Sequence, residues 1–393
     1  MLKHLFILFL VLAFASPSVI AESHHPRVRI SAWYWLNSAP HSDWKGDFTT
    51  MKQMGFTDVL LCWGLDISAV ATRKTDTKLA LQYAHEAGIG VYLLIWHPHA
   101  NSLPQDPKFM QISADGKQLP AFDVFNPEWR STQWKSYLQD VASTYRNEPA
   151  LTGYAFDDSF SGGVYSYGPF EQQAFGSPLP HKPSDPNWDK WVKIRQQWWE
   201  DWASDTVSYI RSADPDPNHE IYIEDTVGSI TNTKRADDKG LDFARVAMHF
   251  DAVGGYTTPV WSDSPDSAAK VSKLTTNAIQ SVRKIIGPGK KMIYTFWSAD
   301  ISEERKPGPA AHPTAAEIQS VCEDALKLGV FQLDMYGYRI GEYKATREEM
   351  ARMVPPEPAP YILTGQFPQK FIWDRPEIHD ALAAYLHTLN SKK

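Results

Sequence analysis

The sequence repeats one unit eight times: a short apolar stretch that ends in aromatic or acidic residues, followed by a longer amphipathic stretch. Alternation of strands and helices is typical of a parallel sheet, and eight such units predict closure into a (β/α)8 TIM barrel. An open doubly wound sheet is the alternative, but the glycine-rich loop that often marks that fold is missing after the first strand. The predicted strands are Arg29 to Trp35, Asp58 to Trp63, Gly90 to Trp96, Leu151 to Asp157, Glu220 to Asp225, Ala252 to Tyr256, Lys291 to Trp297 and Val330 to Tyr336.

Amphipathic stretches connect the predicted strands. Apolar residues recur at three- and four-residue spacing over Asp47 to Met54 and over Thr75 to Ala87, which predicts helices there. The helix expected from Trp188 to Ile210 carries tryptophans at spacings of three, four and seven residues, so most of them fall on one face. We interpret this stripe as the packing face of the fourth barrel helix rather than as a ligand platform.

Two segments depart from the plain repeat. The stretch from Phe160 to Trp188, after the fourth strand, is rich in Gly, Pro and Ser and longer than an ordinary βα loop. We expect it to wall a site or to form an insertion. After Met353 the run PPEPAP ends the last barrel helix, and a short helix from Pro376 to Leu389 is expected in the tail. The predicted organisation is a barrel at residues 22–353 and a C-terminal extension at residues 354–393 that packs on it.

Residues 1–21 have the pattern of a secretory signal peptide. Lys3 precedes an apolar run from Leu5 to Ala15, and small residues follow, with Val19 and Ala21 before the cleavage site. We expect the mature chain to begin at Glu22 and to be secreted or periplasmic. A retained anchor is the alternative, but the apolar run is short for a bilayer span. No later stretch reaches about 18 apolar residues, so no membrane span is expected after cleavage.

Charge and cysteine content narrow the classes of partner. The formal charge of −7 and the lack of a basic stripe argue against nucleic acid as a partner. The sequence implies no cofactor, and no Cys/His spacing predicts a zinc site. The two cysteines, Cys62 and Cys322, could form a disulfide in an oxidising compartment. Two buried free thiols are the alternative.

The predicted strands end in aromatic residues. In a barrel of this kind, the C-terminal strand ends and the loops after them form the active site. Rings at these positions suit a carbohydrate site, because sugar C–H faces stack on aromatic faces while hydroxyls exchange hydrogen bonds with charged groups. The alternative for any single ring is packing in the barrel interior. The expected sugar-contacting residues are Trp35, Trp63, Trp96, Tyr256 and Trp297.

Two acidic pairs close the fourth and fifth predicted strands, Asp157 with Asp158 and Glu224 with Asp225. Successive residues of a strand point to opposite faces, so one member of a pair is expected to face the pocket. Close acids also raise one another's pKa, as a general acid requires. We expect Asp157 or Asp158 to protonate the leaving oxygen or to act as nucleophile, and Glu224, with Asp225 as substitute, to be the complementary carboxylate. A helix N-cap or a structural ion pair is the alternative for each pair.

The third and eighth strands add further candidates. An arginine beside acids, as Arg339 is beside Asp334, can grip a sugar hydroxyl or a carboxylate substituent, or neutralise the acid in the wall. His97 and His99 follow the third strand and could assist proton transfer or bind a metal. The candidate substrate-binding residues of these strands are His97, Asp334, Tyr336 and Arg339.

Several segments resemble a known family. The residues that carry the similarity are Ala32, Asp43-Trp44, the run from Met51 to Thr57, Trp63-Gly64, Tyr167-Gly168 and Ala174-Phe175-Gly176. Their layout resembles the first two βα units and the strand-four region of retaining barrel glycosidases, including the family 42 β-galactosidases. The sequence departs from that family at both catalytic positions. Ser159 stands where the family has its acid–base Glu, and the predicted strand containing Tyr294 to Trp297 supplies no nucleophilic Glu.

The element Phe156-Asp157-Asp158 also resembles secreted barrel hydrolases that carry Phe-Asp-Asp at the fourth strand. The two resemblances together imply a secreted glycoside hydrolase that cleaves a polysaccharide or oligosaccharide by a two-carboxylate acid/base mechanism. One alternative is a non-catalytic glycan-binding barrel of an exopolysaccharide system, which the missing Glu residues favour. The other is a metal-dependent carbohydrate deacetylase or hydrolase that uses His97, His99 and the acids at the strand ends.

Overall fold

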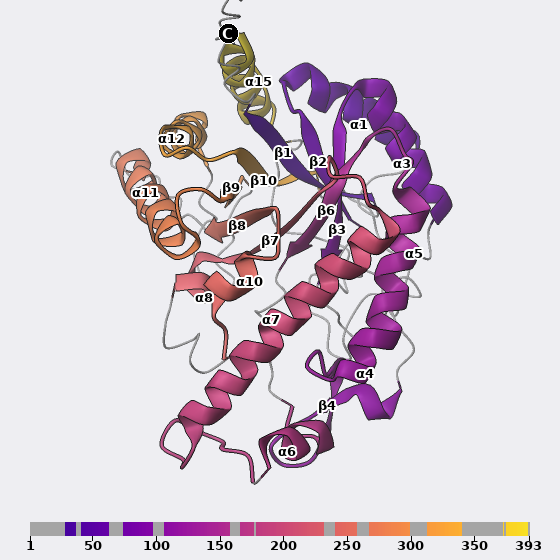
Figure 1. Ribbon diagram of the computed structural model, residues 1–393. Helices are drawn as coiled ribbons and strands as arrows, with labels where there is room; N and C mark the ends of the chain where they lie inside the picture. The colour runs from indigo at the N-terminus through magenta and orange to yellow at the C-terminus, as the bar shows by residue number, and fades with distance from the viewer. Residues whose placement is uncertain are drawn as a thin grey trace, which may run out of the picture.

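The computed structural model describes residues 28–36, 41–62, 74–96, 106–157, 166–176, 178–231, 240–257, 267–298, 313–339, 372 and 375–391. Eight parallel strands close into a barrel in the order β1-β10-β9-β8-β7-β6-β3-β2, with helices around it (Figure 1). The predicted (β/α)8 barrel is confirmed, and the open-sheet alternative is excluded because each barrel strand pairs with two neighbours. The strands are β1 (Arg29–Trp35), β2 (Asp58–Cys62), β3 (Gly90–Trp96), β6 (Leu151–Asp157), β7 (Glu220–Thr226), β8 (Ala252–Thr257), β9 (Lys291–Trp297) and β10 (Gln332–Arg339).

The helices agree with the sequence pattern to within a few residues, with one exception. Helix α1 begins six residues before the predicted start at Asp47, because Trp44 and Phe48 lie on the same buried face as Met51. The described helices of the barrel and its loops are α1 (His41–Met54), α3 (Lys74–Ala87), α4 (Pro127–Trp129), α5 (Lys135–Tyr145), α6 (Pro169–Phe175), α7 (Trp188–Ala213), α8 (Val227–Thr231), α10 (Phe243–Ala247), α11 (Ser267–Ile286) and α12 (Ala315–Lys327). A π-helical turn (Arg130–Trp134) joins α4 to α5. The tail forms α15 (Pro376–Ser391), which packs against α1 and α12.

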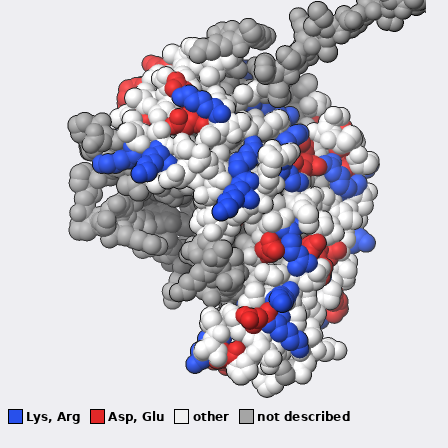
Figure 2. All heavy atoms as spheres, turned by 60° about the vertical axis from the view of Figure 1, so that its left-hand side comes forward, with Lys and Arg blue, Asp and Glu red and all other residues white. Residues whose placement is uncertain are grey.

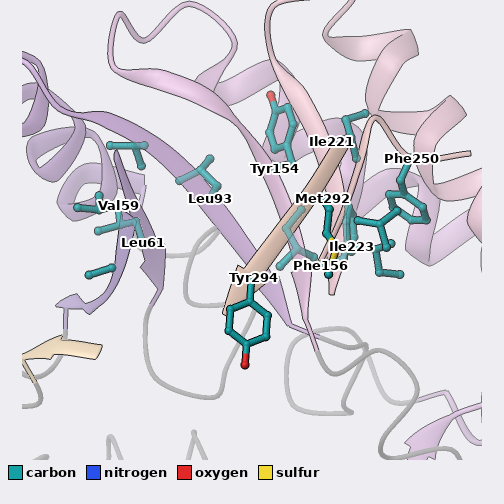
Figure 3. Packing of buried hydrophobic residues seen from close by; sticks show 14 of the residues in the cluster. Val59, Leu61, Leu93, Tyr154, Phe156, Ile221, Ile223, Phe250, Met292 and Tyr294 are labelled. Carbon is teal, nitrogen blue, oxygen red and sulfur yellow. The ribbon is translucent and has the colours of Figure 1, made fainter. Parts of the chain in front are cut away.

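Alternate residues of each barrel strand face either the helices or the barrel interior. Figure 3 shows part of the outward-facing set, such as Phe156 of β6, Ile223 of β7 and Met292 of β9, which belong to the core between barrel and helices. The inward-facing set forms a separate buried cluster inside the barrel. Its members are Trp33, Trp35, Leu60, Tyr92, Leu94, Ala155, Tyr222, Ala252 and Ile293. The strands are therefore buried on both faces, as is typical of parallel sheets.

An antiparallel ribbon that the sequence pattern did not predict follows β3. It consists of β4 (Met110–Ile112) and β5 (Gln118–Phe122). The Tyr167 N–H donates a hydrogen bond to the Ile112 carbonyl (2.7 Å), so the ribbon is joined to the segment that follows β6. Figure 1 shows β4, α4 and α6 close together in the lower part of the view, whereas α15 lies at the top. The segments after β3 and β6 thus build one common wall.

The tryptophan stripe of α7 is buried, which confirms its predicted role as a packing face. Trp202 packs edge-on against Phe156 of β6, whereas Trp198 and Trp199 both pack against Phe125 of the wall after β3. The stripe therefore covers two partners rather than the barrel alone. This double role explains why α7 is 26 residues long, which is more than a barrel strand needs.

Cys322 is a buried free thiol on α12, so the disulfide alternative is not realised in this structure; the Cys62 side chain and the predicted signal peptide lie outside the described residues. Among the described helices, none is both long and apolar enough to cross a membrane. On the described part of the surface in Figure 2, basic and acidic side chains lie side by side. Ion pairs among the described residues include Lys74–Asp140 and Arg130–Asp205.

Candidate active site

The barrel interior holds three acids from different strands. Asp157 is the last residue of β6, Glu224 lies near the end of β7, and Asp334 lies in the first half of β10. Asp157 and Glu224 are register partners on adjacent strands, and both are buried. Adjacent strands lie about 4.8 Å apart, and paired residues of a parallel sheet point to the same face. The two carboxylates therefore share the interior face of the barrel.

Glu224 occupies space that Gly254 of β8 leaves open. The two residues are register partners, and a Cβ atom on Gly254 would lie 2.6 Å from the Glu224 Cβ atom. No side chain larger than hydrogen fits beside Glu224 at that distance. Gly254 therefore permits an acid of this length to fold back inside the barrel.

The hydroxyl of Thr295 lies between Glu224 and Asp334. Thr295 Oγ1 donates to Glu224 Oε2 at 2.5 Å and lies 3.3 Å from Asp334 Oδ2. Asp334 also accepts hydrogen bonds from Ser31 Oγ (2.6 Å) and from Trp33 Nε1 (2.7 Å). Burial raises the pKa of Asp334 to about 6, although the bonds from Ser31 and Trp33 act in the opposite direction.

Below this level the interior holds Tyr222 and Tyr92, whose rings meet edge to face with centroids 5.1 Å apart. Burial raises the pKa of Tyr222 well above its usual range, and the nearby Glu224, Asp334, Tyr92 and Asp157 add to the effect. Tyr222 therefore stays neutral.

An ionic cluster around Glu220 closes the N-terminal end of the barrel. Glu220 accepts hydrogen bonds from Arg29 (3.0 Å), Tyr92 (2.5 Å) and Lys291. Burial alone raises the pKa of Glu220, but the bonds from Lys291 and Tyr92 outweigh it and lower the pKa below its usual value. This charged layer separates the three interior acids from that end of the barrel.

Aromatic rings of β1, β9 and β10 lie together near the C-terminal end of the barrel. Tyr336 of β10 stacks on Trp297 of β9, with centroids 4.4 Å apart and an interplanar angle of 22°. Tyr336 also meets the edge of Trp35 (5.1 Å) and contacts Trp33 (4.8 Å). Trp33 and Trp35 are buried, whereas Trp297, Tyr336 and Tyr256 are partly exposed. The partly exposed rings are the ones that a ligand can reach.

The structure places the remaining predicted residues as follows. Asp225 is next to Glu224 on β7 and therefore faces the helix layer, where it is buried and accepts a hydrogen bond from the Thr226 N–H (2.6 Å). Asp334 is buried and accepts hydrogen bonds from Ser31 and Trp33, so in this structure it braces these side chains. The predicted residues Trp63, His97, His99 and Asp158 lie outside the described residues, as do the side chains of Trp96 and Arg339.

Metal ligation has no support in the described part of the chain. There, no group of three or more His, Cys, Asp or Glu side chains is arranged to hold a metal ion. The two histidines of the metal-dependent alternative lie outside that part.

Sequence reasoning missed Thr295, Ser31 and the bracing role of Trp33. Alternation along β9 gives the signal for Thr295, because it lies two residues before Trp297 and so faces the interior as well. Ser31 and Trp33 share the same parity with Trp35 on β1. Their partner Asp334 is about 300 positions away in the sequence, so only closure of the barrel brings them together.

Comparisons with known proteins agree with this architecture at the level of the fold. No family model and no curated protein matches the sequence. Among solved structures, a β-galactosidase from the Antarctic haloarchaeon Halorubrum lacusprofundi has a TM-score of 0.66 and 13% identity, covering 93% of this chain and 58% of its own. The PgaB (BpsB) glycoside hydrolase domain from Bordetella bronchiseptica has a TM-score of 0.57 and 12% identity, covering 85% of this chain and all of its own.

An endo-β-1,4-mannanase from Thermotoga petrophila is also similar, with a TM-score of 0.51 and 14% identity, covering 94% of this chain and 77% of its own. The chain spans 54% to 58% of the length of the β-galactosidases that it matches. At these identities the likeness concerns the backbone and not the site. The predicted resemblance to barrel glycoside hydrolases is thus confirmed for the fold: the protein has the eight-stranded parallel barrel that β-galactosidases and mannanases share.

Proposed function

We propose that the protein is a glycoside hydrolase that cleaves a polysaccharide or oligosaccharide with Asp157 and Glu224 as its two catalytic carboxyls. The observation that carries this proposal is their register pairing on β6 and β7, on the interior face and at the C-terminal end of the barrel. Active sites of such barrels lie at this end. No other acids of the described strands combine an inward position with a place near the C-terminal end of a barrel strand.

In the proposed reaction, one carboxyl group gives its proton to the glycosidic oxygen as the bond to the anomeric carbon breaks. The other, ionised, carboxylate stabilises the positive charge that develops on the sugar ring, either by attack on the anomeric carbon or by activation of a water. Trp297 and Tyr336 supply partly exposed ring faces on which a sugar can stack. The reaction draws on no other group than these side chains and water.

We also propose that the protein is exported, on the strength of the signal-peptide pattern in residues 1–21. Export gives the enzyme access to extracytoplasmic glycans. N-terminal sequencing of the protein recovered from the native cell envelope or medium tests this point, with Glu22 as the expected first residue. A chain that starts at Met1 contradicts it.

The main experiment screens the purified protein against a panel of polysaccharides and oligosaccharides with detection of new reducing ends. We expect at least one glycan to be cleaved, and we expect Asp157→Asn and Glu224→Gln each to reduce kcat by about 100-fold or more. Matched controls are Asp140→Asn and Glu86→Gln, which change surface acids in the ion pairs Lys74–Asp140 and Lys45–Glu86. Retention of full activity by both interior variants contradicts the proposal.

The same screen decides between the alternatives. Binding of a glycan without release of reducing ends, in the wild type and in Asp157→Asn alike, identifies a non-catalytic glycan-binding barrel. Activity that disappears with a chelator and returns with added metal identifies a metal-dependent hydrolase or deacetylase. For the two-carboxylate mechanism we expect the rate to be insensitive to the chelator.

A further inference from the structure

The Thr295 hydroxyl connects two carboxyl groups that come from distant parts of the sequence. Its oxygen lies 2.5 Å from Glu224 Oε2 and 3.3 Å from Asp334 Oδ2. A hydroxyl has one proton to donate and two lone pairs to accept with. Thr295 can therefore donate to Glu224 and accept from a protonated Asp334 at the same time.

Other hydrogen bonds hold the Asp334 carboxyl in a fixed position in the barrel wall. Ser31 Oγ donates to Oδ1 and Trp33 Nε1 donates to Oδ2, while Gln332 Nε2 donates to Ser31 Oγ (2.9 Å) and so leaves the Ser31 proton for Asp334. The carboxyl is buried, and both of its oxygens are held by these bonds. Its fixed position makes Asp334 a group that acts on Glu224 through Thr295.

We propose that Asp334 is a positioning residue for Glu224, an inference that rests on the proposed function. The two carboxyls share one proton through the Thr295 hydroxyl. As a result, Glu224 keeps a proton to higher pH than an isolated glutamate does. The transfer conserves protons. The Asp334 proton passes to Thr295 Oγ1 while the Thr295 proton passes to Glu224 Oε2, and Thr295 stays neutral. Two interacting acids lose their protons in two steps that belong to the pair.

Burial supports this sharing, since it raises the pKa of Asp334 to about 6 and so keeps a proton in the pair above the usual carboxyl range. Among the described residues, the other titratable groups of this interior are Tyr222 on β7, Tyr92 on β3 and Asp157 on β6. The described charged groups at the opposite end of the barrel are Arg29 on β1, Asp58 on β2, Glu220 on β7 and Lys291 on β9; Glu220 pairs with Arg29 and with Lys291. None of these groups belongs to the bridge of Glu224, Thr295 and Asp334.

Asp334→Asn is the decisive variant, and the structure can accommodate it. The Asn Oδ1 atom can still accept from Trp33. Its Nδ2 group can donate to Ser31 Oγ, whose own proton then turns to the Leu333 carbonyl, 3.3 Å away. The substitution therefore removes the shared proton and the charge while hydrogen bonding is retained.

The test follows Glu224 directly by carbon-13 NMR of the side-chain carboxyl in glutamate-labelled protein, with Glu224→Gln to assign the signal. In the wild type we expect part of the Glu224 titration to occur in a step near pH 6 or above. In Asp334→Asn we expect a single step, lower by about one pH unit, because the like charge is gone. In Thr295→Val we expect the step near pH 6 or above to be lost as well, because the proton can no longer pass between the two carboxyls.

Thr295→Ser, which keeps the hydroxyl, is expected to retain the wild-type titration. This result distinguishes sharing from a purely structural role, because a loosened interior moves the titration toward that of an ordinary glutamate whether or not a hydroxyl is present. Thr275→Val is the matched control, since Thr275 is a buried threonine on α11 outside the barrel interior. We expect it to leave the titration unchanged. Equal Glu224 titrations in the wild type, Asp334→Asn and Thr295→Val overturn the inference.

Kinetics give a second readout if the wild type cleaves a glycan. In Asp334→Asn we expect one limb of the pH–rate profile to shift to lower pH by about one unit, while KM stays within about twofold of the wild-type value. Thr295→Ser is expected to restore the wild-type profile that Thr295→Val loses. Because the NMR titration needs no substrate, an inactive wild type contradicts the proposed function alone, whereas an unmoved titration contradicts this inference alone.

Discussion

Gly254 leaves the space that the Glu224 side chain occupies: a Cβ atom on Gly254 would lie 2.6 Å from the Glu224 Cβ atom and 2.9 Å from its Oε2 atom. We therefore expect Gly254→Ala to displace Glu224, to lower kcat by about 100-fold and to cost about 1–3 kcal/mol in the free energy of unfolding. Urea denaturation and kinetics on the cleaved glycan measure both effects. Gly289→Ala is the control, because no atom lies within 4 Å of the added methyl group there.

Trp297 and Tyr336 form the partly exposed stack at the barrel mouth. We expect Trp297→Ala to raise KM about tenfold, because loss of one stacking face costs about 1 kcal/mol or slightly more. Trp297→Phe, which keeps an aromatic face, is expected to recover most of the affinity. A fall in kcat at unchanged KM is the result that does not fit a sugar-stacking role.

Asp123 lies in the wall after β3, where burial and then the charge of Glu171 raise its pKa well above the usual 3.8. The folded state therefore holds the Asp123 proton more tightly than the unfolded chain does. The contribution of this proton to the free energy of unfolding is therefore largest below about pH 4, where Asp123 is protonated in both states. It decreases as the pH rises toward the pKa of Asp123 in the folded state. Asp123→Asn does not ionise, so we expect no such decrease in the variant. The thermal midpoint of the variant minus that of the wild type is therefore expected to increase with pH.

Thermal unfolding from pH 4 to pH 8 measures this difference. Asp115→Asn serves as the control on the same ribbon, because Asp115 is exposed and its pKa is lowered by its hydrogen bonds with Lys117 and Ser113. A constant offset between Asp123→Asn and the wild type over the whole range argues against a proton held by Asp123.

Trp202 joins α7 to the barrel through the edge of Phe156, with centroids 6.3 Å apart, and it also meets Trp199. Because it is almost fully buried, we expect Trp202→Ala to cost about 3–5 kcal/mol in the free energy of unfolding. The KM of the folded fraction is expected to stay unchanged. A large change in KM without loss of stability contradicts our interpretation of the tryptophan stripe as a packing face.

The fold follows from the sequence because its signals are local. Each barrel strand is a compact apolar run, such as Leu151–Asp157, and each connecting helix shows its own periodicity. Parallel strands place their C-terminal ends at one edge, so the sequence alone predicts a common site for Asp157 and Glu224. The β4–β5 ribbon escaped prediction because its strands of three and five residues carry too few residues to establish a periodicity.

The choice between the acids needed the tertiary structure. Glu224 and Asp225 are neighbours on a strand that is buried on both faces, so hydrophobicity does not tell which of them faces the interior. The same holds for the bridge of Glu224, Thr295 and Asp334, whose members come from three different strands. The sequence by itself determined the barrel and the end of it that carries the acids, because strand and helix periodicity are properties of short segments. Only the tertiary structure decided which acids meet, because barrel closure and register set contacts between residues that are far apart in the chain.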